Sequence, residues 1–334
     1  MKQQKLVLNN VDSFELPHIF DCGQCFRWDI QSDGSYIGVI KSGVMRVSKV
    51  GNSIIFEGIL DGDINSIVYD YFDLGTDYNV FKKRLAVIDS NMKKSVEFGS
   101  GIRILKQDLW EMIISYIISA NNNIPRIKGI INRISKRVGK KVSWNGVDYY
   151  LFPTVEELAK LSVSDLRELG TGFRDKRIYK TTQMILNKDI DLESLRSAAL
   201  RNESDLDCLK SVALKNECYI ERLKDKCAKS TDEIREILLS LEGVGEKVAD
   251  CILLFGLHRF DTFPVDVWVR RVMNTLYIHN EDETKVNKKQ IRDTAYELFG
   301  DIEGIAQQYL FYWARENFWI IFINNRKINS NMIY

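Results

Sequence analysis

Hydrophobic and polar positions alternate in the first part of the chain and then change to a helical spacing. Runs rich in β-branched and aromatic residues are separated there by the turn sequences QSDG, KSG and VGN. Alternating runs joined by such turns predict an antiparallel sheet. The predicted strands span residues 25–30, 35–40, 44–49 and 53–57.

From Asp63 onward the apolar positions recur every three or four residues, which is the spacing of amphipathic helices. A glycine-containing segment, residues 98–105, is the expected linker to the helical part that follows. We therefore expect an α+β fold in which helices continue to the end of the second domain. Its parts are an N-terminal antiparallel sheet domain (1–100), a mostly α-helical domain (101–325) and a polar tail (326–334).

The composition is that of a globular protein without a membrane segment. The chain has 334 residues, of which 45% are hydrophobic and 28% are charged, which suffices for two or three domains. No stretch approaches the roughly 18 successive apolar residues that span a bilayer, and the first residues lack the apolar segment of a secretory signal. We expect a cytoplasmic protein that does not bind membranes.

Basic residues are concentrated in one region, although the net charge of the chain is only +1. Residues 121–147 contain seven basic residues and no acidic ones. Such a patch can bind phosphate groups while acidic segments elsewhere balance its charge. A solvated helix face explains the pattern equally well, so both interpretations stay open on this observation alone.

The cysteines give little support for a redox or metal site. Six are present, at positions 22, 25, 208, 218, 227 and 251, and we expect reduced thiols. Cys22 and Cys25 have CxxC spacing, but a zinc site needs two further ligands, and the three histidines are isolated in the sequence. A thioredoxin-like site would be followed by a βαβ pattern, which is not found here. A redox or metal module is the least favoured alternative.

The segment IREILLSLEGVGEKVADCILLFG, residues 234–256, is the most informative part of the sequence. One apolar helix ends near Leu241, the turn Gly243-Val244-Gly245 follows, and a second apolar helix begins near Glu246. Glycines in the turn allow another backbone to approach, and free N–H groups at the start of a helix bind anions. This helix-hairpin-helix pattern predicts phosphate binding, although a tight helical connection without a ligand can use the same turn.

Lys247 and Asp266 are the candidate catalytic residues. Lys247 lies in the first turn of the second hairpin helix, where the helix dipole disfavours a cation and, together with burial, favours the neutral amine that a nucleophile needs. An ordinary surface lysine is the alternative on spacing alone. Asp266 is placed to cap the helix that begins at Val267, and it could act as a cap, as a catalytic group or as both.

Short motifs along nearly the whole chain resemble those of one enzyme family. They are GQCFRW (residues 23–28), SANNNIPR (119–126), GFR (172–174), GVGEKVADC (243–251), PVDV (264–267) and QQYLF (307–311). In this order they resemble the 8-oxoguanine DNA glycosylase/AP lyases of the helix-hairpin-helix (HhH-GPD) superfamily. Iron–sulfur relatives have a cysteine cluster after the catalytic segment. Since this chain has no cysteine beyond Cys251, no iron–sulfur cluster is expected.

The resemblance implies a bifunctional enzyme of base excision repair. Its sheet domain would be of the TATA-box-binding-protein type and would contribute to the base pocket. Lys247 would attack C1′ of a flipped nucleotide and form a Schiff base, which leads to strand nicking by β-elimination. Asp266 would stabilise the oxocarbenium-like transition state.

The resemblance also implies how the oxidised base is recognised. 8-Oxoguanine carries N7–H where guanine has an acceptor, and the Gly23 carbonyl would accept that hydrogen. Gln307 would bond to the Watson–Crick edge, while Phe311 stacks on the base and a Lys247–Cys251 thiolate pair adds a matching dipole. The predicted base-binding residues are Gly23, Cys251, Pro264, Gln307 and Phe311.

For the DNA, the resemblance implies that Asn121 fills the vacated space, Phe173 wedges beside the opposite base, and Arg126 with Arg174 reads an opposite cytosine. The predicted DNA-binding residues are Asn121, Arg126, Phe173, Arg174, Gly243, Gly245 and Val248. The backbone carbonyls of Leu239, Leu241 and Val244 are candidate ligands for a monovalent cation at the hairpin. No cofactor is expected to be required.

Three features depart from the family pattern. Phe173 replaces the tyrosine that is common at the wedge, which could relax the preference for opposite cytosine. Trp268 stands where eukaryotic members have a phosphate-contacting histidine, so we assign no such contact to it. The charged stretch at residues 196–224 is longer than the family pattern suggests, and its role is open.

We expect a monomer that acts on double-stranded DNA containing 8-oxoguanine, in the bacterial cytoplasm and with the nucleoid. Two other functions stay open. A glycosylase for another damaged base would keep the aspartate but not the lysine, so Lys247 and the trio Gly23, Gln307 and Phe311 argue against it. A non-catalytic DNA-binding module with the same hairpin would bind DNA without cleaving it.

Overall fold

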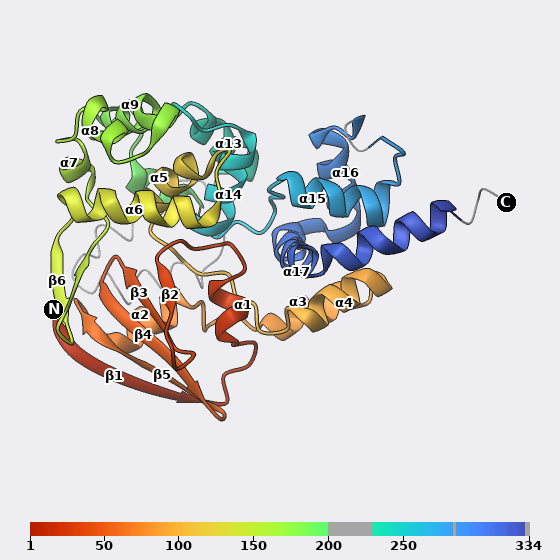
Figure 1. The fold of residues 1–334 in the computed structure, drawn as a ribbon, viewed down its shortest axis with the longest axis horizontal. Coiled ribbons are helices and arrows are strands. Elements are labelled where there is room, and N and C mark those ends of the chain that lie inside the picture. Colours follow the sequence, from red (N-terminus) through yellow and green to blue (C-terminus); the bar gives the residue numbers. More distant parts are fainter. Residues whose placement is uncertain (200–228, 283–284, 331–334) are drawn as a thin grey trace.

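The N-terminal part of the computed structural model is a five-stranded antiparallel sheet (Figure 1). The model describes residues 1–199, 229–282 and 285–330. The strand order is β1-β5-β4-β3-β2, and the expected α+β fold is confirmed. The strands are β1 (Lys2–Asn9), β2 (Trp28–Ile30), β3 (Tyr36–Ile40), β4 (Gly43–Val50) and β5 (Ser53–Leu60).

Strand β1 was absent from the sequence-based prediction. It pairs with β5 along its whole length, from Lys2 opposite Leu60 to Asn9 opposite Ser53. Its residues are exposed or half-buried, as at the edge of a sheet, and its first residues are polar. The pattern of alternating buried positions that marks the central strands is therefore weak here.

One face of the sheet packs on two short helices, α1 (Leu16–Phe20) and α2 (Ile64–Tyr71). Aromatic side chains fill this core. The ring of Phe20 stacks on Trp28 at 4.2 Å between centroids, and Phe72 packs against Phe14 and Phe56. This first core holds the loop that follows α1, which carries Gly23, on a rigid base.

The rest of the chain is mostly helical. The longer helices are α3 (Tyr78–Ala86), α4 (Ser90–Phe98), α5 (Leu109–Ser119), α6 (Ile124–Val138), α9 (Asp175–Leu186), α10 (Leu192–Ala199), α13 (Thr231–Leu239), α14 (Glu246–Gly256), α15 (Val267–Met273), α16 (Lys288–Phe299) and α17 (Glu303–Ser330). Short elements are α7 (Val155–Leu158), α8 (Val163–Glu168), η1 (Gly172–Arg174), η2 (Asn274–Ile278) and η4 (Gly300–Ile302).

Helices α5 and α14 pack against each other in the centre of the second core (Figure 1). Every residue of α5 from Leu109 to Ile118 is buried. Asp108 caps the start of α5 by accepting a hydrogen bond from the Glu111 N–H, and Ala120 follows its end. The helix therefore leads from the core directly to the loop that contains Asn121.

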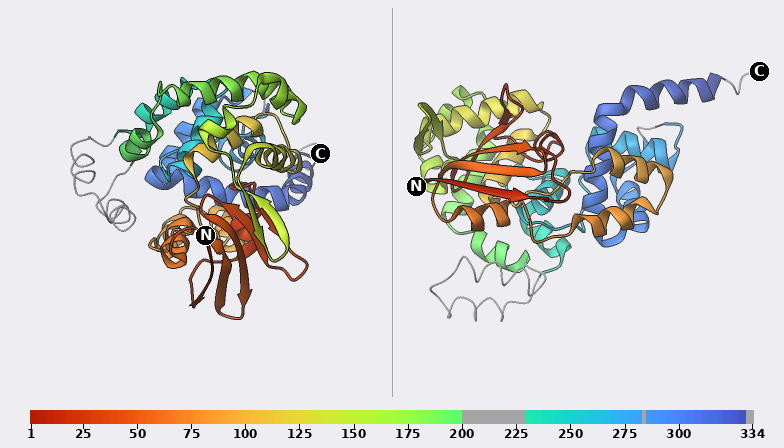
Figure 2. Two further views of the ribbon diagram at one scale, coloured as in Figure 1. Left: turned by 90° about the vertical axis from the view of Figure 1, so that its left-hand side faces the viewer. Right: turned by 90° about the horizontal axis from the view of Figure 1, so that it is seen from below.

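The predicted domain boundary at residue 100 does not separate the two cores in space. Helices α3 and α4 precede it, yet they lie beside α17 (Figure 2). Their side chains Tyr78, Leu85, Met92 and Val96 belong to the core of the helical part. Their amphipathic spacing predicts helices, but spacing alone does not say which core their apolar faces join.

The expectation of helices through the whole second domain was wrong at one place. Residues 141–150 form a two-stranded sheet, β6 (Lys141–Trp144) and β7 (Val147–Tyr150). Asn145 and Gly146 both have positive φ, of 50° and 76°, as a two-residue hairpin turn requires, and Asn-Gly is the strongest sequence signal for it. Val142 and Trp144 pack on Val44 of the large sheet.

The predicted polar tail begins inside a helix. Helix α17 continues through Ser330, so the boundary at residue 325 falls inside a helix. Residues 331–334, like most of the long charged stretch at 196–224, lie outside the described residues. None of the described helices combines the length and the apolar character needed to cross a bilayer.

Candidate active site

Lys247 lies at the start of α14, two residues after the N-cap Gly245. Its side chain is half-buried, and its Nζ lies 5.3 Å from the centre of the Tyr116 ring. Its charge also acts on the Cys251 thiol and the Asp266 carboxyl. The structure thus places the amine beside an aromatic ring, a thiol and a carboxyl group.

Cys251 lies one turn further along α14 and is only 4% exposed. Burial raises the pKa of its thiol to about 11, although the hydrogen bond and the charge of Lys247 act in the opposite direction. The thiol therefore stays neutral at physiological pH. In this DNA-free structure the thiolate of the expected lysine–thiolate pair is disfavoured.

Asp266 caps a helix, and its carboxyl lies close to Lys247. As the N-cap of α15 it accepts a 2.8 Å hydrogen bond from the Val269 N–H. Burial raises the pKa of its carboxyl, while the Val269 N–H and the charge of Lys247 lower it. The carboxylate is thus held in a fixed orientation close enough to Lys247 for their charges to interact.

Tyr116 links the lysine to the first domain, and the sequence analysis missed it. Its buried ring stacks on Phe255 and meets Phe26 edge-on, with centroids 5.7 and 5.5 Å apart. The hydroxyl donates a 3.4 Å hydrogen bond to the Gln24 carbonyl. In the sequence Tyr116 looks like one more apolar position of α5, whose residues around it are all buried. The signal that could have found it is its hydroxyl, which needs a partner in a buried position.

Gly23 lies against Phe311 in a conformation that favours glycine. Its φ is +86°, and a Cβ at this position would lie only 3.0 Å from Cε1 of Phe311. Any side chain would therefore be strained and would push the phenylalanine aside. The structure brings together the two residues that the motifs GQCFRW and QQYLF placed far apart in the sequence.

The carbonyls on both sides of Gly23 are engaged. Cys22 O accepts a 2.6 Å hydrogen bond from Gln308 Nε2, and Gln24 O accepts one of 2.8 Å from Gln107 Nε2. Within the described residues, the Gly23 carbonyl accepts no hydrogen bond. The loop thus presents one free acceptor between fixed neighbours.

Gln307 and Phe311 are four residues apart on α17 and so share a face. Gln307 is only 5% exposed, and its Oε1 has no hydrogen-bond partner among the described residues. A buried polar atom without a partner costs free energy, so this oxygen is a candidate for contact with a ligand. Pro264 is also buried, in the segment that leads to Asp266.

The predicted wedge lies on the surface next to the end of α5. Phe173, in η1, is 56% exposed and has the Arg174 guanidinium beneath its ring at 4.2 Å. Asn121 is exposed and has a positive φ of 51°. Arg126 is exposed in the first turn of α6. These three side chains can reach a ligand from solvent.

Arg174 has a different environment from the one predicted for a base-reading residue. It is buried, and its guanidinium donates hydrogen bonds to the carbonyls of Ala120, Asn121 and Thr171, at 3.0, 2.8 and 3.2 Å. In this structure it fixes the loop that carries Asn121. It would have to exchange these partners before it could bind a base.

The two hairpin glycines differ in their surroundings. Gly243 has a φ of +87°, and a Cβ there would lie 2.8 Å from the side chain of Arg177. Gly245 is exposed, and a Cβ there would meet nothing within 4 Å. The Val248 side chain is buried, so only its backbone N–H, in the first turn of α14, is a candidate for contact with a phosphate. The turn therefore requires glycine at position 243, whereas glycine at position 245 leaves the start of α14 open to a ligand.

The structure adds no support for a cation at the hairpin or for a metal or redox site at Cys22 and Cys25. Leu241 O, one of the three carbonyls predicted to bind a cation, accepts a 3.1 Å hydrogen bond from the Val244 N–H. Cys22 and Cys25 are free and buried, and they belong to different cores, the helical one and the sheet one. In the part of the chain that the structure describes, no cluster of histidine, cysteine and carboxylate side chains could hold a metal ion.

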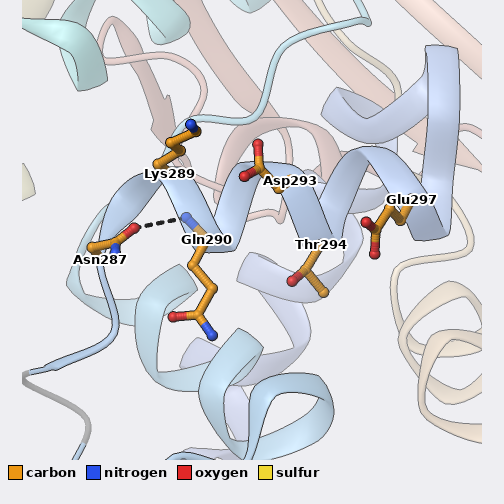
Figure 3. A pocket seen from close by; sticks show the side chains of 6 residues that line it. All are labelled: Asn287, Lys289, Gln290, Asp293, Thr294 and Glu297. Atoms are coloured by element: carbon orange, nitrogen blue, oxygen red, sulfur yellow. Dashed lines mark hydrogen bonds between the residues drawn. The ribbon is translucent and has the colours of Figure 1, made fainter.

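A shallow hollow on the outer side of α16 is separate from the candidate site (Figure 3). Asn287 Oδ1 there accepts a 2.8 Å hydrogen bond from the Gln290 N–H and caps the helix. The lining side chains come from α16 and its cap, and none of them is a predicted site residue. They are Asn287, Lys289, Gln290, Asp293, Thr294 and Glu297.

Comparisons with known proteins cover both parts of the chain. Residues 6–113 match the N-terminal domain of 8-oxoguanine DNA glycosylase, and residues 114–297 match the HhH-GPD superfamily base excision DNA repair protein. The N-glycosylase/DNA lyase of Saccharomyces cerevisiae is 37% identical over 86% of this chain and 73% of its own length. A probable N-glycosylase/DNA lyase of Methanothermobacter thermautotrophicus is 32% identical over 74% and 73%.

A solved structure extends the similarity to the fold. The Clostridium acetobutylicum 8-oxoguanine glycosylase/lyase, in complex with double-stranded DNA containing cytosine opposite 8-oxoguanine, has a TM-score of 0.81 and 40% sequence identity. The match covers 95% of this chain and 97% of that one. The chain therefore belongs to the HhH-GPD superfamily of base excision DNA repair proteins and carries the N-terminal domain of the 8-oxoguanine DNA glycosylases.

Proposed function

We propose that the protein is a bifunctional DNA glycosylase/AP lyase that removes 8-oxoguanine from duplex DNA, preferably opposite cytosine, and then nicks the strand. One arrangement carries this proposal. A half-buried lysine interacts with a fixed aspartate, and Tyr116 connects that pair to a loop whose Gly23 carbonyl accepts no hydrogen bond from the residues that the structure describes. The family relationship supports the same substrate, because the similar clostridial enzyme was solved with 8-oxoguanine opposite cytosine.

Recognition of the lesion depends on the acceptors that the site leaves free. The Gly23 carbonyl can accept a hydrogen bond from the N7–H of 8-oxoguanine. In guanine N7 is itself an acceptor, so two acceptors would face each other with no hydrogen between them. A mismatch of this kind in a buried site costs about 1–3 kcal/mol. The free Oε1 of Gln307 suits an N–H of the Watson–Crick edge, and Phe311 provides a ring on which the base can stack.

The chemistry needs an unprotonated amine and a stabilised positive charge. The Lys247 amine attacks C1′ as the protonated base leaves, so that a C–N bond forms while the glycosidic bond breaks. The C1′–O4′ bond then breaks as a proton passes from the amine to O4′, which opens the sugar ring and leaves a C1′=N Schiff base. Removal of a C2′ proton next breaks the C3′–O bond and expels the 3′ phosphate. The Asp266 carboxylate stabilises the sugar cation of the first step. None of these steps requires a cofactor.

Several surface groups are proposed to hold the DNA. Asn121 enters the space of the flipped base, Phe173 wedges beside its partner, and Arg126 contacts the opposite cytosine. Arg174 joins that contact after it releases the carbonyls that it binds in the free protein. A monomer, a bacterial nucleoid location and a monovalent cation at the hairpin stay predictions.

The hairpin is proposed to bind a phosphate through backbone N–H groups at the start of α14. Gly243→Ala should lower the free energy of unfolding by about 1–2 kcal/mol, because φ is positive and Arg177 is in contact. Gly245→Ala should lower the free energy of unfolding by less than about 1 kcal/mol, because alanine is the poorer N-cap. It should weaken duplex binding about tenfold, because the methyl group occupies the approach of the phosphate. Thermal unfolding and fluorescence anisotropy measure the two effects. Equal DNA affinity of wild type and Gly245→Ala would contradict the proposed phosphate site.

The function itself is tested with duplexes that differ at one base pair. The wild-type protein should release the base and nick the strand when 8-oxoguanine lies opposite cytosine, and borohydride should trap a covalent complex. An identical duplex with guanine should stay intact. Release of an alkylated base alone would indicate a glycosylase for another lesion, and binding without release of either base would indicate a non-catalytic module.

A further inference from the structure

Arg315 lies at the edge of the proposed base pocket, although no motif identified it. It follows Gln307 and Phe311 on the same face of α17, since the three residues are spaced by four. Its guanidinium lies 5.7 Å from the centre of the Phe311 ring. Its Nη1 would be 3.8 Å from a Cβ at Gly23. The arginine is thus next to both parts of the pocket.

The guanidinium connects α17 to the loop of the sheet domain. Nη2 donates a hydrogen bond to the Asp21 carbonyl, two residues before Gly23. Nε and Nη2 also bond to Glu316 Oε1 at 3.1 and 3.0 Å, which fixes the plane of the group. The side chain is 21% exposed and its bonds lie at the solvent side of the pocket. Because the guanidinium is charged, these bonds are stronger than those between neutral groups.

Other bonds already fix the loop on its far side. Gln308 Nε2 holds the Cys22 carbonyl, while the buried Gln24 side chain donates to the carbonyls of Ile19 and Arg103. Arg315 supplies the corresponding bond at the solvent side, through Asp21. Without it, the segment before Gly23 would lose its outer attachment while the inner ones remain.

We propose that Arg315 is a positioning residue for lesion recognition: it clamps Asp21 to α17 and so sets the direction of the Gly23 carbonyl relative to Phe311. This inference rests on the proposed function, because the carbonyl matters only if it accepts N7–H of the base. A hydrogen bond weakens steeply when its angle falls. Loosening of the loop therefore reduces base binding, whereas the lysine and the aspartate, on α14 and α15, keep their places.

The test compares two reactions of the same protein. Excision of 8-oxoguanine needs the clamp, but nicking of a preformed abasic site does not, because that site has no base. Arg315→Met keeps the apolar stem over Phe311 and removes the donors. It should lower the single-turnover rate of 8-oxoguanine release about tenfold and leave nicking of the abasic site within about twofold. Arg315→Lys, which can still donate to Asp21, should recover most of the excision rate.

A matched variant controls for the lost charge. Arg84→Met removes an exposed arginine from α3, where it pairs with Asp301, and should change neither reaction. Two results would overturn the clamp, provided that the wild-type protein excises 8-oxoguanine. One is an unchanged excision rate in Arg315→Met, and the other is an equal loss of excision and nicking in that variant. Failure of the wild type to release 8-oxoguanine would instead overturn the proposed function and, with it, the clamp.

Discussion

Lys247→Gln is expected to abolish the borohydride-trapped complex and to lower base release by on the order of 10³-fold or more. Glutamine has no amine to attack C1′, so neither the Schiff base nor the nicking that follows from it can form. The glutamine side chain is one atom shorter than lysine and stays polar beside the Tyr116 ring, which Lys247 Nζ approaches to 5.3 Å in the wild type. Denaturing electrophoresis of borohydride-treated reactions measures the complex directly.

The control for this variant is its ability to bind. Lys247 is only half-buried and the hairpin glycines are unchanged, so Lys247→Gln should unfold like the wild type and still bind the 8-oxoguanine duplex. A variant that retains the trapped complex would show that another amine is the nucleophile. In that case the geometry around Tyr116 would have a structural role only.

Asp266→Asn should lower the rate of base release by about 10²–10³-fold, which is typical when one electrostatic contact to a transition state is removed. The choice of asparagine separates the two roles of the residue. An asparagine oxygen can still accept the hydrogen bond from the Val269 N–H, and asparagine is as good an N-cap as aspartate. Stability should therefore be retained, whereas Asp266→Ala should lose both the cap and the activity.

The pH profile gives an independent measure of the same carboxyl. Burial raises the pKa of Asp266 above its ordinary value of 3.8, and the ionised form is the one that stabilises a sugar cation. Activity should therefore rise with pH as Asp266 loses its proton, with a midpoint above 3.8. Asp266→Asn should lack this acidic limb in single-turnover measurements. An identical limb in the variant would assign the titration to another group.

Much of the fold could be predicted from local patterns, and the errors share a physical cause. Strands β3 and β5 alternate between faces, and α5 and α14 have long apolar stripes, so each is visible within its own segment. Strand β1 acquires its structure by pairing with β5. A distant partner stabilises it, and an edge strand with one half-buried face carries only part of the usual pattern.

The same distinction applies to the site. Lys247, Asp266 and Gly23 could be found because each sits in a motif with its own local geometry. Tyr116 and Arg315 could not, because their roles come from contacts with residues about 90 and 290 positions away. For Arg174 the motif could be recognised, but the place of the side chain could not be predicted from it. Its guanidinium is buried and donates hydrogen bonds to backbone carbonyls.

The carbonyl at position 23 has a consequence for the timing of folding. The loop that carries it is held by the side chains of Gln308 and Arg315, which both belong to α17. Lys247 and Asp266 are both synthesised before that helix. In a growing chain both residues of the proposed chemistry are therefore present before those that hold the loop, so the ability to discriminate between bases is acquired only when α17 docks.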